Sequence, residues 1–231
     1  MATAALTVRQ LRHNWKPWKD RNQGNPRGTN TNIRMHRAFS WLSRADECDE
    51  TGDNDVKLMC LWIAFNALYN QWDASAREPK PDRLGWSHFI SRIAGLDKGG
   101  LLGAFLLEQQ PLVYSILESE HLNQWFWEDP NATRAAQARK ARRMAPSLYL
   151  EHKWASITEY AVDRVYLLRC QLVHGAASVD SQLNREPLEH CTRFLRGLVS
   201  TTAMIIIENG ASEDWGLLCY PPLGDGRTAA N

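Results

Sequence analysis

Apolar residues recur along most of this chain at intervals of three and four positions, the spacing that places them on one face of an α-helix. The pattern is clearest over residues 159–175, where the apolar positions are Val162, Val165, Tyr166, Leu168, Leu172 and Val173. Gly175 follows, and glycine takes the positive φ with which helices commonly end. We therefore expect the last turns of an amphipathic helix, closed at this glycine.

The same spacing predicts helices through the rest of the chain. They are expected over residues 3–12, 32–45, 55–71, 86–93, 101–109, 112–117, 121–127, 131–144, 147–168 and 187–208. Helix 55–71 is apolar on nearly all sides, which places it at the centre of the fold, and Asp53 or Asn54 is positioned to cap it. Glycine, proline and asparagine interrupt the pattern over residues 22–32, and residues 180–186 connect the last two helices.

These elements predict an all-α fold. No set of strands, internal repeat or domain linker is evident, and 231 residues suit a single domain. We expect an α-helical bundle built around two core antiparallel helices over residues 35–208. A basic N-terminal arm at residues 1–34 and an irregular C-terminal tail at residues 209–231 would flank it.

Composition narrows the class of protein. Hydrophobic residues make up 44% of the chain and charged residues 23%, as in ordinary globular domains, and no apolar run is long enough to cross a membrane. The five cysteines are scattered, and the N-terminus lacks the features of a signal peptide. Reduced thiols and a cytoplasmic location are therefore expected.

Basic residues gather in two places, although the net charge is only +1. Residues 1–44 carry nine Lys or Arg against one acid, and a second cluster contains Arg139, Lys140, Arg142 and Arg143. Such a cluster either guides a polyanion such as RNA or only solvates a helix face, and both interpretations stay open. The Trp-Phe-Trp stretch at residues 125–127 is most simply core, although exposed rings there would stack on bases.

Several familiar chemistries lack their sequence signals. Glycine-rich phosphate loops, serine-hydrolase elbows and histidine pairs at metal-binding spacing are absent. No metal and no cofactor is therefore expected. The candidate chemistry that remains is Arg169 and His174, five residues apart at the end of the helix over residues 159–175.

Helical geometry places Arg169 and His174 about 140° apart around the helix axis and about 7.5 Å apart along it. Cationic side chains in a last turn also interact favourably with the helix dipole, by about 0.3–1 kcal/mol each, so the spacing alone does not require a functional site. Asn66 is the polar exception in helix 55–71, and a buried asparagine needs hydrogen-bond partners. It either satisfies a neighbouring group or helps to position Arg169 or His174.

Residues 168–175, Leu-Arg-Cys-Gln-Leu-Val-His-Gly, resemble the signature of the HEPN superfamily, in which a histidine follows an arginine after four to six residues. An Arg-x4-His-Gly ending is common in the Apea-like branch of that superfamily. Residues 61–69, Leu-Trp-Ile-Ala-Phe-Asn-Ala-Leu-Tyr, resemble the apolar helix with an internal asparagine that precedes the motif in the same branch. The resemblance covers roughly residues 35–208.

The resemblance implies a domain of four or five helices that forms a homodimer and brings two Arg–His motifs into one cleft. Many members are metal-independent endoribonucleases of defence or toxin systems, which leave 2′,3′-cyclic phosphate and 5′-hydroxyl ends. By that analogy His174 is the general acid or base and Arg169 is the phosphate contact. Supporting roles fall to Asn66, Cys170 and Asp163. The implied partners are RNA, a second copy of the chain, and an antitoxin or regulatory protein, with no membrane.

The apolar positions Val162, Tyr166 and Val173 between the two motif residues give a physical reason for pairing. One departure from the family matters, because asparagine or another polar residue often follows the arginine, whereas this chain has Cys170, a weak hydrogen-bond former. The alternative is therefore a non-catalytic HEPN module that binds RNA, a nucleotide or a protein. A third interpretation, a purely structural all-α protein, applies if Arg169 and His174 lie apart, buried and separately satisfied.

Overall fold

The all-α prediction is confirmed in a computed structural model of the chain, which describes residues 6–21, 25–176, 178 and 184–222. Its α-helices, in chain order, are α1 Val8–Arg21, α2 Pro26–Thr51, α3 Asn54–Tyr69, α4 Asp82–Leu96, α5 Leu101–Glu108, α6 Gln110–Glu118, α7 Gln124–Glu128, α8 Ala132–Ala138, α9 Lys140–Leu150, α10 Trp154–Val173 and α11 Arg185–Ile205. The described residues also form a 3-10 helix, η1 Glu120–Leu122, and a π-helical turn, η2 Ile206–Gly210. A two-stranded antiparallel hairpin, β1 Trp72–Asp73 with β2 Glu78–Pro79, is an element that the sequence pattern does not predict.

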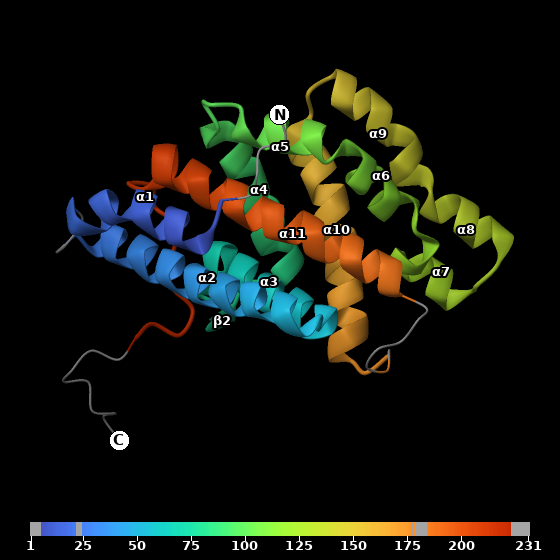
Figure 1. The fold of residues 1–231 in the computed structure, drawn as a ribbon, viewed down its shortest axis with the longest axis horizontal. Coiled ribbons are helices and arrows are strands. Elements are labelled where there is room, and N and C mark those ends of the chain that lie inside the picture. The colour runs from blue at the N-terminus through green and yellow to red at the C-terminus, as the bar shows by residue number, and fades with distance from the viewer. Residues whose placement is uncertain (1–5, 22–24, 177, 179–183, 223–231) are drawn as a thin grey trace.

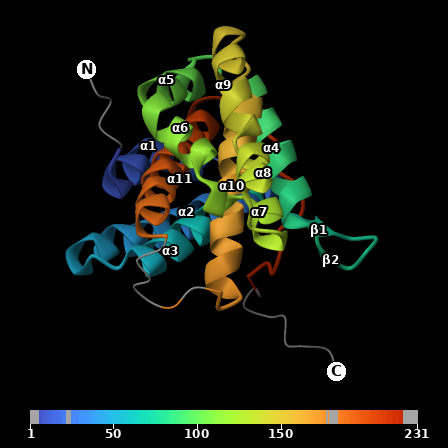
Figure 2. The same cartoon turned by 90° about the vertical axis from the view of Figure 1, so that its right-hand side faces the viewer.

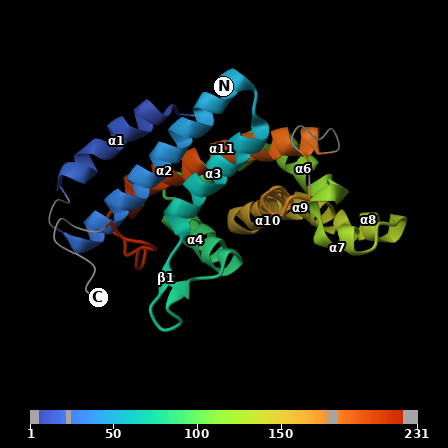
Figure 3. The same cartoon turned by 90° about the horizontal axis from the view of Figure 1, so that it is seen from below.

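α2 and α3 are joined at residues 52–53 and lie side by side as an antiparallel pair (Figure 1). α11 packs against α3, and α1 packs against α2. Figure 3 shows α10 almost end-on while α2, α3 and α11 run across the view, so α10 crosses this layer steeply. α4, α6 and α9 pack around α10. The helix that carries the Arg–His motif is therefore held between two groups of helices and is not one of the antiparallel pair.

α3 supplies the centre of the core, as its continuous apolar pattern predicts. Asp53 caps it by accepting a hydrogen bond from the Val56 amide at 2.9 Å, which confirms one of the two predicted caps. Trp62, Phe65 and Tyr69 form a cluster of edge-to-face ring contacts. Such pairs contribute about 0.5–1.5 kcal/mol each beyond the burial of their area.

α2 is longer at both ends than the predicted helix over residues 32–45. Asn25 accepts a hydrogen bond from the Arg27 amide, and Pro26 occupies the first helical position, where its missing N–H costs nothing. Gly52, at a φ of 71°, ends the helix. The loop predicted over residues 22–32 is therefore wrong from residue 26 onward, because this proline starts a helix. Residues 22–24 lie outside the described part of the chain.

The N-terminal residues belong to the bundle. α1 packs against α2 and α11, and its Leu11 and Trp15 are buried in the core. The expected boundary at residue 34 falls inside α2. A separate basic arm is thus wrong for the described residues, because both helices bury apolar side chains. Residues 1–5, part of the helix expected over 3–12, lie outside them.

Residues 211–222 have no regular structure, as predicted for the tail, yet they pack onto the bundle. Their buried side chains are Ala211, Trp215, Leu218 and Cys219. Arg34 of α2, only 3% exposed, donates hydrogen bonds of 3.0–3.2 Å to the backbone carbonyls of residues 215–217. Burial lowers the pKa of Arg34 to about 10, so the guanidinium remains charged at neutral pH. Residues 223–231 lie outside the described part.

The chain between α7 and α10 is divided differently from its prediction. The expected basic helix over residues 131–144 is split at Arg139 into α8 and α9, and α9 continues through Pro146 to Leu150. His152, at a φ of 54°, separates α9 from α10. The expected connection over residues 180–186 is described only from Asn184 onward. Among the described helices, none combines the length and the apolar character needed to cross a membrane.

Candidate functional site at the end of α10

The end of α10 has the geometry that its sequence predicts. The Ala176 amide donates to the Gln171 carbonyl at 2.9 Å and the Gly175 amide donates to the Leu172 carbonyl at 3.2 Å, with Gly175 at a φ of 67°. This pair of bonds is a Schellman motif, and it leaves His174 exposed at the helix cap. Figure 1 and Figure 2 both place this end of α10 at the lower edge of the helical bundle, so the motif lies where another molecule can approach.

Arg169 faces aromatic neighbours. Its guanidinium carbon lies 5.9 Å from the centroid of the Tyr166 ring, and its Nη1 lies 3.9 Å from Cys170 Sγ. Its Nε is buried and has no hydrogen-bond partner. Within the described residues no carboxylate forms an ion pair with Arg169. The guanidinium therefore keeps donors that an anion can use.

Asn66 is held by α3 and α4. Its Nδ2 donates to the Tyr69 hydroxyl and to Asp82 Oδ1, both at 3.1 Å, and the Tyr69 hydroxyl donates to the same Asp82 oxygen at 2.9 Å. Burial, followed by the Asp82 charge, raises the pKa of Tyr69 well above its ordinary value. The phenol therefore stays protonated at neutral pH and serves as a hydrogen-bond donor. The sequence predicts that Asn66 either satisfies the hydrogen bonds of neighbouring groups or positions Arg169 or His174. Its contacts, with Tyr69 and Asp82, fit the first of these roles.

His174 lines a groove of about 730 Å³ between the end of α10, helix α7 and the start of α11. The lining residues with polar or aromatic groups include Trp127, Glu128, Cys170, Gln171, His174 and Asn184. Arg169 does not line this groove, which agrees with the predicted separation of the two residues, about 140° around the helix. Cys170 contacts Arg169 and also lines the groove, so it lies between the two motif residues.

Asp163 forms an ion pair with Arg83 of α4 and makes no contact with His174 among the described residues. The Arg83 guanidinium carbon lies 6.0 Å from the Tyr166 ring centroid, while Arg169 lies 5.9 Å from the same ring. Two guanidiniums from different helices thus approach one aromatic ring. Arg83 is therefore a further candidate residue of this site. The sequence does not indicate it, because it lies in another helix and belongs to no motif.

The basic cluster at the start of α9 is not a uniformly free surface. Arg139 forms an ion pair of 3.3 Å with Glu120. The guanidinium of Arg142 lies 3.7 Å above the Tyr114 ring. These two side chains therefore have partners inside the protein, which reduces the charge they offer to RNA.

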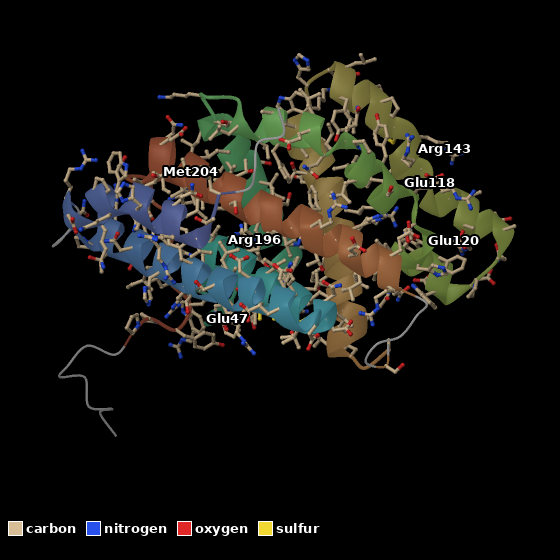
Figure 4. The ribbon with its side chains drawn as sticks, viewed as in Figure 1. Glu47, Glu118, Glu120, Arg143, Arg196 and Met204 are labelled. Atoms are coloured by element: carbon tan, nitrogen blue, oxygen red, sulfur yellow. The ribbon has the colours of Figure 1, made fainter. Side chains whose placement is uncertain are left out.

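The other two residues of that cluster differ from each other. Arg143 donates to the Ala136 carbonyl at 3.1 Å and so holds α8 to α9, while Lys140 is exposed. Figure 4 shows Arg143 on the same side of the molecule as Glu118 and Glu120. Acidic side chains share this side, and one of them, Glu120, pairs with Arg139, so it is not a purely cationic track.

The tryptophans of α7 are exposed, 50% for Trp125 and 43% for Trp127. The prediction that they belong to the core is wrong, because α7 is a short helix that buries none of its residues. Trp127 lines the groove and its indole N–H donates to the His121 carbonyl at 2.8 Å. Trp125 does not line the groove.

A second cavity, of about 470 Å³, lies between α5 and α11, and no residue of α10 lines it. Arg196 and Met204, which follow one another along α11 in Figure 4, are part of its wall. Arg196 makes two hydrogen bonds of 2.7 and 3.0 Å to the carboxylate of Asp46 in α2. Its charge therefore holds α2 to α11 and is not available to a ligand.

In the described part of the chain, no group of three or more His, Cys, Asp or Glu side chains is placed to hold a metal ion. Compared with models of protein families, with curated proteins and with solved structures, the chain gives no match. The site therefore has to be judged by its own groups, which are an exposed imidazole, a guanidinium with free donors and a groove beside the imidazole.

Proposed function

We propose that this chain is an endoribonuclease of the HEPN type, which needs no metal ion and works as a homodimer. The observation that carries the proposal is the last turn of α10. It presents the exposed His174 at the groove and, on the neighbouring face, Arg169 with no acidic partner among the described residues. An imidazole can take up or release a proton and a guanidinium is a permanent cation, which suits the ribose hydroxyl and the phosphate of RNA.

His174 takes the proton of the ribose 2′-hydroxyl, and the freed oxygen attacks the adjacent phosphorus. The bond to the 5′-oxygen breaks, and that oxygen leaves with a proton from a second imidazole. The products are a 2′,3′-cyclic phosphate and a 5′-hydroxyl. Arg169 holds the scissile phosphate and stabilises the charge that grows on its oxygens.

One chain supplies one His174, whereas the reaction needs a base and an acid. A two-fold dimer supplies both from the same residue. Support for pairing at this end comes from Val173, which is 50% exposed on the last turn of α10. Tyr166 is half-buried there, while Val162 is buried in the core and contributes nothing to a seam.

A second candidate is a non-catalytic HEPN-type module that binds RNA. The observation that favours it is the orientation of Arg169, which faces Tyr166 and does not line the groove that holds His174. A cleavage site needs both groups on one phosphate, and in this alternative the second copy does not bring them together.

The resemblance to nucleases of defence or toxin systems also suggests where the protein acts and which partner controls it. We place the enzyme in the cytoplasm, where its five free cysteines would stay reduced, and expect an antitoxin or other regulatory protein to restrain it. Lys140, with Arg139, Arg142 and Arg143, would guide RNA only weakly, because three of these four have partners within the protein.

The test is cleavage of a mixed-sequence RNA in the presence of a chelator. Wild type is expected to produce fragments that end in a cyclic phosphate, and His174→Ala and Arg169→Ala are each expected to lose about 100-fold or more of that rate. His88→Ala and Arg193→Ala serve as matched controls, since both residues are exposed and lie outside the site. Equal rates in all five proteins would remove the motif from the mechanism. RNA binding and dimer formation without turnover would favour the non-catalytic module.

A further inference from the structure

We infer that the groove beside His174 is a nucleobase subsite that selects bases carrying an exocyclic amino group. This inference rests on the proposed function, since it names the part of an RNA strand that the groove takes. A volume of about 730 Å³ lies within the usual range of small-molecule pockets, about 300–1,000 Å³, and is ample for one nucleotide.

A chain of hydrogen bonds fixes the polar wall of the groove. The His121 backbone carbonyl can only accept, and it receives the Trp127 indole N–H at 2.8 Å and the Gln171 Nε2 at 2.9 Å. The amide of Gln171 is thereby oriented, so its Oε1 accepts from Asn184 Nδ2 at 2.9 Å. These hydrogen bonds fix the orientation of both amides. Asn184 Nδ2 is committed to Gln171, so the Asn184 side-chain atom without a partner is the oxygen Oδ1.

Asn184 Oδ1 is a hydrogen-bond acceptor without a partner. Asn184 is 9% exposed and lines the groove, and its Oδ1 is buried with no hydrogen bond. Asn184 also precedes α11 without capping it through its side chain, so helix capping does not account for the residue. A buried acceptor left unpaired is costly. Oδ1 is covered in this structure, so a ligand that offers an N–H group removes that cost once the Asn184 side chain turns toward the groove.

Two neighbours specify the kind of donor. Trp127 presents an aromatic ring on which a base can stack, and its indole is held by the same His121 carbonyl that orients the relay. Glu128 adds a second acceptor to the groove. The amino groups of adenine, cytosine and guanine supply N–H donors to such a wall. Uracil offers a single ring N–H between two carbonyl oxygens, which would face the Glu128 carboxylate.

The experiment measures binding of short labelled oligonucleotides by fluorescence anisotropy. Every ribose carries a 2′-O-methyl group, which removes the attacking hydroxyl and keeps the probe intact. Matched probes contain adenosine or purine riboside, and guanosine or inosine, so that each pair differs only in the amino group. Wild type is expected to bind the amino-bearing member of at least one pair about tenfold more tightly. Asn184→Leu is expected to bring that ratio close to one.

Two further variants separate stacking from amino-group recognition. Trp127→Ala should weaken both members of a pair about equally, by about fivefold or more, whereas the exposed neighbour Trp125→Ala should change neither. Gln171→Met frees the Asn184 amide to rotate and should reduce the ratio while binding persists. The ratio of the wild-type affinities for the two members of a pair tests the inference without any variant. The inference therefore stays testable if Asn184→Leu does not fold.

The outcomes distinguish this inference from the proposed nuclease. Equal affinity of wild type for both members of each pair overturns the base subsite, and cleavage of unmodified RNA in the same preparation would leave the nuclease standing. If wild type prefers the amino-bearing probes but does not cleave unmodified RNA, the base subsite stands and the proposed nuclease is overturned. Absence of binding by any probe overturns the subsite.

Discussion

Cys170 is the residue at which the two halves of the candidate site meet. Its sulfur lies 3.9 Å from Arg169 Nη1, a long contact with a weak acceptor, and the residue also lines the groove with His174. Burial, followed by the neighbouring Cys170 thiol, raises the pKa of Tyr166, so this phenol too is a hydrogen-bond donor at neutral pH. The guanidinium is therefore oriented by packing more than by strong hydrogen bonds.

Replacing this cysteine tests that weakness. Cys170→Asn should raise the single-turnover rate of RNA cleavage about fivefold, because an amide oxygen accepts from a guanidinium more strongly than a thiol, by about 1 kcal/mol. Cys170→Ala is the matched control and should change the rate little. If the asparagine and alanine variants cleave at the same rate, Cys170 does not set the orientation of Arg169.

For single residues, the sequence predicts well the roles that depend only on neighbours along the chain, such as ending or capping a helix. Gly175 and Asp53 are local signals, a glycine after an apolar pattern and an acid before one, and both take the predicted roles. Arg83 and Asn184 could not be found in this way. Their importance arises from neighbours on other elements, Tyr166 and Gln171, which only the packed structure identifies.

Among the elements, α10 depends on a close approach to α5. Gly103 of α5 lies against Trp154 at the first turn of α10, where an added Cβ would meet the indole at 2.8–2.9 Å. The indole is itself confined, since it stacks on His152 with ring centroids 5.1 Å apart and contacts Tyr149 edge-on. The start of the motif helix is thus positioned by a glycine in a different helix.

Gly103→Ala should therefore destabilise the protein, by about 1–3 kcal/mol, despite the better helix propensity of alanine. Gly95→Ala in α4 is the control, because nothing lies within 4 Å of its added Cβ, and it should stabilise by about 0.5 kcal/mol. Urea unfolding followed by circular dichroism measures both. A Gly103→Ala variant as stable as wild type would show that Trp154 moves aside freely.

The existence of most helices follows from apolar periodicity, while their ends follow from chemistry that periodicity does not report. Pro26 interrupts an apolar pattern and yet begins α2, since Asn25 caps the helix directly before it. Pro146 is accommodated within α9. A proline is therefore a poor guide to a helix boundary unless the residue before it is considered together with it.

For the molecule as a whole, the sequence indicates the helical class but not the arrangement. Nothing in the apolar pattern of α10 indicates that it crosses α2, α3 and α11 steeply (Figure 3). That crossing is a tertiary effect, and it places the motif end of α10 at the edge of the bundle, where a two-fold partner would have access.

Val173→Glu tests that arrangement. A carboxylate on this exposed apolar position would have to be desolvated in the dimer, so the dissociation constant should rise about tenfold or more, with a parallel loss of RNA cleavage. Sedimentation velocity over a concentration series measures the dimer. Leu150→Glu is the control, since Leu150 is 83% exposed on α9 and lies away from the motif. Unchanged association in Val173→Glu would exclude pairing through this end of α10.

The Arg34 contacts have a consequence for biosynthesis. The carbonyls that receive this guanidinium leave the ribosome more than 180 residues after it does. Arg34 Nη1 donates to the Leu68 and Asn70 carbonyls at the end of α3, but Nη2 has its acceptors only in residues 215–217. Until those residues arrive, closing α2 over α3 would bury Nη2 without them, and a buried donor left unpaired costs about 1–3 kcal/mol. We therefore expect the seam between α2 and α3 to close fully only when residues 215–217 pack against it.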